Sequence, residues 1–87
     1  MAAGVYKAAY RLGIRIPEQL SVVGFDDSPI ASRLWPSLTT VRLPSYDLGW
    51  TAATLLQDRI AGTPRPLQTV VLRTALEVRD STAGPRV

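Results

Sequence analysis

The chain has 87 residues, of which 46% are hydrophobic, so it can form one small domain or part of a larger one and is too apolar for a disordered segment. It contains no cysteine and no histidine, which excludes disulfides, thiolate metal sites and a catalytic triad with a histidine base. The formal net charge of +3 comes from arginines scattered along the sequence, a pattern typical of a solvated basic surface and not of a nucleic-acid-binding face.

The first predicted element is a helix over residues 1–12, where apolar side chains recur at helical spacing. Arg11 lies in the last turn, where a cation suits the helix dipole, and Gly13 is placed to end the helix. The residues that follow are expected to be extended as far as Pro17, because a residue before proline avoids the helical region.

A continuous apolar run over residues 21–25 predicts a short strand that is covered on both faces. The run ends in two adjacent carboxylates, Asp26 and Asp27. Ligands of open α/β sheets bind beyond the carboxyl ends of the strands, so this position favours small-molecule binding. Ser28 then suits an N-cap and Pro29 the first position of a short helix that ends before Pro36.

The second half of the sequence predicts a strand, a helix and one or two further strands. Residues 38–43 are rich in β-branched side chains, and Ser45 is placed to cap a helix that runs to residue 61. Residues 67–78 predict strand structure, most strongly at 69–72, and the tail from Asp80 is expected to be mobile. This alternation of helices and strands predicts the α/β class.

The sequence resembles the C-terminal part of the LacI/GalR family of bacterial transcriptional regulators. The resemblance rests on the order and spacing of the following motifs: Ala3-Gly4, Ala8-Ala9, Leu12-Gly13, Ile16-Pro17, Ser21-Val22-Val23-Gly24-Phe25-Asp26-Asp27, Pro36-x-Leu38-Thr39-Thr40-Val41, Leu48-Gly49 with Ala52, and Arg79-x-Ser81-Thr82. It implies a fragment of a periplasmic-binding-protein-like (type I) fold, in which two α/β subdomains with parallel sheets close over an effector. The helix-turn-helix domain that reads operator DNA in this family is absent from these residues.

The resemblance also implies how the chain is divided between the two subdomains. Residues 1–42 would belong to the C-terminal subdomain, residues 43–72 to the N-terminal one, and residues 73–87 would return as a strand and a mobile tail. Arg42 and Leu43 would then form part of the hinge. Because the fragment completes neither core, we expect it to fold by exchanging elements with a second copy.

The same resemblance implies which residues bind the effector. Asp26 is the strongest candidate, because the first aspartate of this pair lines the cleft in the family and a carboxylate accepts hydrogen bonds from sugar hydroxyls. Its structural alternative is a cap for the following turn, and Asp27 fits that structural role better. Phe25 could pack against a sugar or belong to the core, and Ser45 could contact the effector or cap its helix.

A segment after the short helix corresponds to part of the family's dimer interface. Arginine and tryptophan are frequent anchors of such interfaces, although Trp35 could instead fold onto its own domain. The residues assigned to this interface are Ile30, Arg33, Leu34 and Trp35.

The resulting functional prediction is the effector-binding part of a cytoplasmic regulator, with a sugar or other small metabolite as effector, a homodimeric partner and no cofactor. DNA would be contacted only through the domain absent here, and no membrane is involved, since no apolar run approaches the roughly 20 residues that span a bilayer. A transport-type sugar-binding protein of the same fold superfamily is the alternative. An enzyme is disfavoured, because adjacent aspartates at a strand end point in different directions and make a poor acid–base pair.

Overall fold

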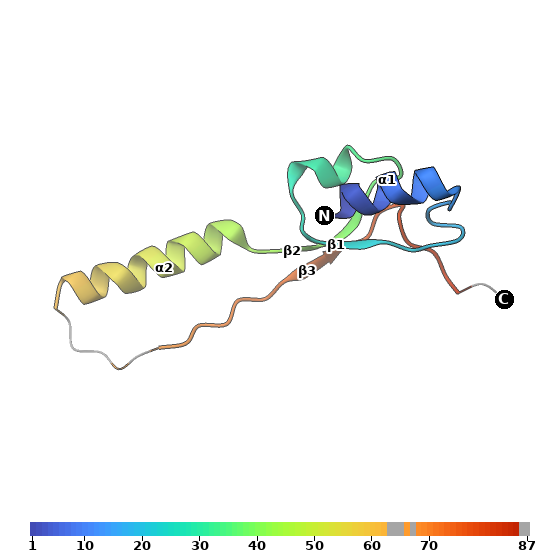
Figure 1. Cartoon of the computed structure of the whole chain (residues 1–87). Coiled ribbons are helices and arrows are strands. Elements are labelled where there is room, and N and C mark those ends of the chain that lie inside the picture. Colours follow the sequence, from blue (N-terminus) through green and yellow to red (C-terminus); the bar gives the residue numbers. More distant parts are fainter. Residues whose placement is uncertain (63–65, 67, 86–87) are drawn as a thin grey trace. The chain divides into compact units, whose positions relative to one another are not determined.

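The computed structural model of the chain describes residues 1–62, 66 and 68–85 (Figure 1). The backbone divides into two compact units. Unit 1 comprises Met1–Leu43 together with Ala75–Val87, and unit 2 comprises Pro44–Thr74. The chain therefore leaves unit 1 after Leu43 and returns to it at Ala75.

Unit 1 begins with helix α1 (Ala2–Leu12), which ends as predicted at Gly13. Gly13 has a φ of 71°, a left-handed conformation that costs glycine little, and its N–H donates to carbonyls of the last turn. The predicted short helix is a single turn of 3-10 helix, η1 (Pro29–Ser32), with Pro29 at its start as expected. Ser28 occupies the predicted N-cap position, although its side chain makes no capping hydrogen bond.

Three strands form the sheet of unit 1 in the order β1 (Val23–Asp26), β2 (Thr39–Arg42) and β3 (Ala75–Glu77). Strands β1 and β2 are parallel, with Val23 opposite Thr39 and Asp26 opposite Arg42. Strand β3 runs antiparallel to β2. The predicted α/β class is confirmed, and the sheet is mixed, with parallel pairing between β1 and β2.

The core of unit 1 lies between the sheet and its helices, which Figure 1 shows on one side of the strands. Its buried residues are Val22, Ala31 and Leu38, and the partly buried apolar side chains around them come from α1, the following loop and the segment after η1. The backbone of β1 approaches Leu38 so closely at Gly24 that a Cβ there would lie 2.6 Å from Leu38 Cδ2. Only glycine fits this position without displacing a buried side chain.

The prediction that the first strand is covered on both faces is wrong for this chain. Val23 is 57% exposed and Phe25 is 69% exposed. Successive side chains of a strand point to opposite faces, and among the described residues α1 and η1 pack against only one of them. An apolar run thus indicated a strand correctly, but it did not show which face the chain itself covers.

Residues 80–83 of the tail are hydrogen-bonded to unit 1, contrary to the expectation of mobility from Asp80 onward, while residues 86 and 87 lie outside the described part of the chain. Ser81 is fully buried; its Oγ donates to the Val22 carbonyl at 2.6 Å and accepts from the Thr39 N–H at 2.8 Å. The Asp80 N–H also donates to the Ser37 carbonyl. The polar composition of this segment suggested exposure, but the Ser81 hydroxyl satisfies two buried backbone groups, one just before β1 and one in β2.

The described residues of unit 2 include the helix α2 (Ser45–Ile60). Pro44, not Ser45, occupies the N-cap position, and Gly62 follows the helix with a φ of 75°. None of the helix residues is buried. No described helix is both long enough and apolar enough to cross a membrane.

The strand predicted most strongly at residues 69–72 is not formed. Residues 68–74 lie outside any strand, and residue 67 lies outside the described part of the chain. An extended segment becomes a strand only when a neighbour pairs with its backbone groups, and the described part of unit 2 provides none.

Candidate functional site

The turn that follows β1 has an unusual backbone. Asp26 has a φ of 92° and Asp27 a φ of 51°, so two consecutive non-glycine residues adopt positive φ angles. Aspartate tolerates this region better than most residues, but two in succession require support from the surrounding structure. In the described part of the chain, the side-chain hydrogen bonds and ion pairs that provide this support are made by Asp27.

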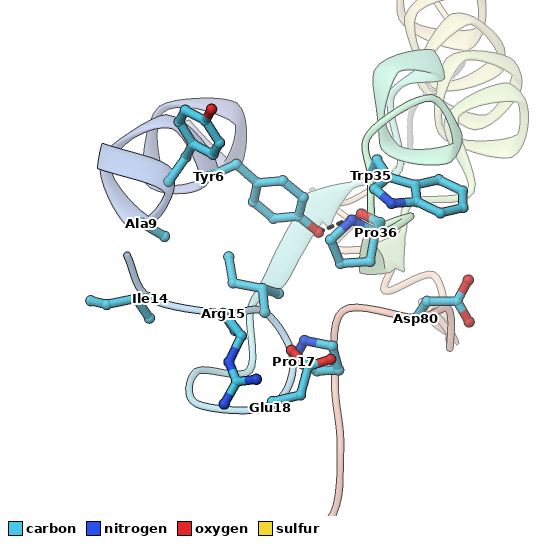
Figure 2. A pocket seen from close by; sticks show the side chains of 11 residues that line it. Tyr6, Ala9, Ile14, Arg15, Pro17, Glu18, Trp35, Pro36 and Asp80 are labelled. Atoms are coloured by element: carbon cyan, nitrogen blue, oxygen red, sulfur yellow. Dashed lines mark hydrogen bonds between the residues drawn. The ribbon is translucent and has the colours of Figure 1, made fainter. Parts of the chain in front are cut away.

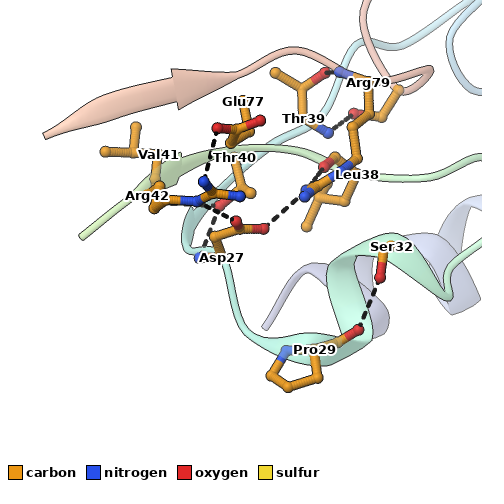
Figure 3. Close-up of polar contacts among 11 residues, drawn as sticks. Asp27, Pro29, Ser32, Leu38, Thr39, Thr40, Val41, Arg42, Glu77 and Arg79 are labelled. Atoms are coloured by element: carbon orange, nitrogen blue, oxygen red, sulfur yellow. Dashed lines mark hydrogen bonds and ion pairs between the residues drawn. The ribbon is translucent and has the colours of Figure 1, made fainter. Parts of the chain in front are cut away.

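Asp27 is the centre of a charged network at the carboxyl ends of β1 and β2 (Figure 3). Its carboxylate accepts hydrogen bonds from Arg79 Nη1 at 2.8 Å and from Arg42 Nε at 3.0 Å. Its own N–H donates to Thr40 Oγ1 at 3.2 Å. Arg42 also pairs with Glu77 at 3.2 Å, so the network joins the turn to all three strands or their ends.

The electrostatics of this network keep Asp27 ionised. Hydrogen bonds from Arg79 and then from Arg42 lower the pKa of the Asp27 carboxyl below its ordinary value. Its side chain is only 9% exposed, whereas that of Arg42 is 54% exposed. Asp27 is therefore a shielded structural anion, in agreement with the structural role that the sequence suggested for it.

Asp26, the predicted effector ligand, differs sharply from its neighbour. It lies at the end of β1, it is exposed, and its carboxylate has no hydrogen bond or ion pair with any residue in the described part of the chain. A free carboxylate at the carboxyl end of a parallel strand can accept hydrogen bonds from hydroxyl groups of a small molecule.

The two other predicted effector ligands lie in different units. Phe25 directly precedes Asp26 in β1, and its ring is exposed, so no other described residue buries it. Ser45 is the first residue of α2 in unit 2 and is exposed there. Asp26 and Phe25 are thus adjacent, while Ser45 belongs to the other unit.

The predicted dimer-interface residues lie on and just after η1. Ile30 is 50% exposed and Trp35 is 94% exposed, so Trp35 does not pack onto the described residues of unit 1. Arg33 is also exposed, whereas Leu34 is partly buried against the core. Of the four, Leu34 therefore has a packing role within unit 1.

Trp35 borders an open hollow that is also lined by Tyr6, Tyr10, Arg15 and Glu18 (Figure 2). Tyr6 points across this hollow, and its hydroxyl donates to the Pro36 carbonyl at 2.7 Å. Burial raises the pKa of that hydroxyl. Its aromatic rings and Arg15 are residue types that are enriched at protein contacts, whereas Glu18 is of a type that is depleted there.

Arg42 and Leu43, the predicted hinge, are the last two residues before the chain enters unit 2. Sequence reasoning did not foresee that Arg42 also belongs to the charged network, nor that Arg79 and Glu77 do. Arg79 was visible only as the first residue of the motif Arg79-x-Ser81-Thr82, and that motif was the signal that could have identified it. Within residues 1–62, 66 and 68–85, no group of acidic side chains is arranged to hold a metal ion.

Known proteins match almost the entire chain. A family model described as a periplasmic binding protein-like domain matches residues 1–82. The HTH-type transcriptional regulator MalR of Streptomyces coelicolor is 47% identical over 84 residues, which are 97% of this chain and 24% of that protein. The ribose operon repressor of Halalkalibacterium halodurans is 45% identical over 84 residues, with 97% and 25% covered.

A solved structure of a LacI family transcriptional regulator from Enterococcus faecalis with bound ribose has a TM-score of 0.88 and 36% identity. The match covers 94% of this chain and 31% of that one. The chain spans about a quarter of the length of the two curated relatives named above. Since the family model extends over residues 1–82, the chain belongs to the family of periplasmic binding protein-like domains.

Proposed function

We propose that the chain is part of the effector-binding core of a LacI-type transcriptional regulator and corresponds to the C-terminal part of that core. The names of its relatives support the regulatory role, and the Enterococcus regulator with bound ribose supports a sugar as the class of effector. An enzymatic role is not favoured, because these relatives are regulators. The transport-type alternative is not favoured for the same reason.

The observation that carries this proposal is the contrast between the two adjacent aspartates. Asp27 accepts hydrogen bonds from two arginines, whereas the Asp26 carboxylate, at the end of a parallel strand, has no partner among the residues that the structure describes. A carboxylate that stabilises nothing within its own unit is available to a ligand. Phe25, adjacent and exposed, supplies an apolar surface beside it.

The division into units supports a two-subdomain arrangement. In the proposed assignment, residues 1–42 and 73–87 contribute to the C-terminal subdomain and residues 43–72 to the N-terminal one, with Arg42 and Leu43 at the hinge. The unit boundaries after Leu43 and before Ala75 lie close to these positions. Effector binding would favour one arrangement of the two subdomains, and a homodimer would pass this arrangement on to DNA-binding domains outside these residues.

The direct test is an NMR titration of the 87-residue chain with D-ribose, following the backbone amides. We expect saturable shifts at Phe25 and Asp26, and we expect Asp26→Asn to remove them because the amide lacks the second acceptor and the charge. Asp47→Asn in α2 is the matched control and should leave the titration unchanged. Saturable shifts of equal affinity in Asp26→Asn would contradict the assignment of this carboxylate to the effector.

A further inference from the structure

We propose that Asp27 is a positioning residue for the effector site: its carboxylate, held by Arg79 and Arg42, maintains the backbone turn that presents Asp26. The role of Asp26 as an effector ligand rests on the function proposed above, but the structural part of this inference does not. Asp27 itself would not touch the effector, because its side chain is only 9% exposed and each oxygen already accepts a hydrogen bond from an arginine.

The first step is the strain in the turn. Asp26 and Asp27 have φ angles of 92° and 51°, and neither is glycine. Such conformations persist only where neighbouring contacts determine them. In the described part of the chain, the side-chain contacts that hold this turn all belong to Asp27 or end on its N–H group.

The second step is that one arginine of the network is itself immobilised. Arg79 Nη1 donates to the Leu38 carbonyl at 2.8 Å as well as to Asp27, and the Arg79 N–H donates to Thr39 Oγ1 at 2.9 Å. Its side chain is 20% exposed. Arg79 thus forms a fixed anchor that is attached to β2 and to the tail, and the Asp27 carboxylate is held against it.

The third step concerns Arg42, which is the more exposed partner. It lies two positions before Pro44, where unit 2 begins, and it pairs with Glu77 in β3 shortly after the chain returns at Ala75. The Asp27 carboxylate is therefore joined to both strands that connect unit 1 to unit 2. A rotation of either strand that moves Arg42 would pull on the Asp27 carboxylate and so displace the turn that carries Asp26.

The structural test uses NMR of the 87-residue chain, in which a positive φ gives a strong NOE between the amide proton and the α proton of the same residue. We expect Asp27→Asn to weaken this NOE at residue 26 while the cross-strand NOEs between β1 and β2 remain. Asp47→Asn is the control and should change neither signal. Persistence of the residue 26 NOE in folded Asp27→Asn would overturn the proposal.

A second variant keeps the test decisive if Asp27→Asn does not fold. Arg42→Gln removes only the exposed ion pairs and leaves the Arg79 anchor in place. We expect a partial loss of the residue 26 NOE in this variant, and an unchanged NOE would refute the coupling to the connecting strands. Arg79→Gln removes the charge that pairs with Asp27, so it should behave like Asp27→Asn.

The functional arm repeats the D-ribose titration with Asp27→Asn. Partners that orient a binding group are worth about 10- to 100-fold in affinity where they have been measured at metal sites, and we expect a loss in that range here. If Asp26→Asn leaves ribose binding unchanged, the proposed function fails while the backbone result still stands. If Asp26→Asn weakens binding and folded Asp27→Asn does not, the positioning role is refuted and the proposed function stands.

Discussion

The replacement of Ser81 by alanine should be among the most destabilising single changes in unit 1. Ser81 is 0% exposed, and its hydroxyl is at the same time a donor to the Val22 carbonyl and an acceptor for the Thr39 N–H. Val22 and Thr39 are themselves buried, so water cannot easily replace the lost partner. The substitution removes one oxygen and leaves two backbone groups without a side-chain partner.

The magnitude follows from those two groups. A buried donor or acceptor that loses its partner costs about 1–3 kcal/mol, and a carbonyl tolerates the loss better than an N–H. We therefore expect Ser81→Ala to lower the free energy of unfolding by about 3 kcal/mol. Small domains are stable by only about 5–15 kcal/mol, so this would be a large part of the total.

Ser37→Ala provides a matched control, because the Ser37 hydroxyl donates to Asp80 Oδ2 in the same tail segment but in an exposed position. Exposed substitutions of this kind change stability by about 0.5 kcal/mol or less. Urea unfolding followed by circular dichroism would compare the two variants, and hydrogen exchange at the Thr39 amide should accelerate only in Ser81→Ala. An equal loss of stability in both variants would refute the assignment of Ser81 as a buried bridge.

Three further predictions concern packing, pH and self-association. Gly24→Ala should lower the free energy of unfolding by about 1–3 kcal/mol, because the added Cβ would clash with Leu38. Gly4→Ala is the control, since nothing lies within 4 Å of the Cβ that it adds. Equal stability of the two variants would contradict the close approach at Gly24. The pKa of Asp27 is lower in the folded chain than in the unfolded one. The stability that its ionised carboxylate contributes is therefore fully present above the unfolded-state pKa of about 4 and is lost as pH falls through the folded-state pKa. Asp27→Asn should therefore flatten the acid limb of the unfolding free energy, and an unaltered slope in acid would exclude this carboxylate as its source. If Trp35 is an interface anchor, Trp35→Ala should lower the self-association constant measured by sedimentation equilibrium by at least about tenfold. Trp50→Ala, at the exposed tryptophan of α2, is the control and should leave that constant unchanged. An unchanged constant in Trp35→Ala would remove Trp35 from the proposed interface.

Several features of the chain were predictable from the sequence because they depend on neighbouring residues. The spacing of apolar side chains in α1 and the glycine at its end are local signals, and both the helix and its left-handed terminus are present. The β-branched run that became β2 and the proline that opens η1 are of the same kind. The motifs that indicated the family are also contained in short stretches of sequence, and the family match extends across them.

Other features depend on which distant segments the fold brings together. Arg79 reaches Asp27 across 52 positions, and Ser81 reaches Val22 across 59, so no local pattern could assign either contact. The same reason explains the errors: an apolar strand does not reveal that one face stays open, and residues 68–74 have strand propensity without a partner to pair with. The sequence by itself determined the local elements and the family, because propensity and periodicity act over a few residues. Only the tertiary structure decided which groups hold Asp27, because its two arginine partners lie in segments that meet only in the folded chain.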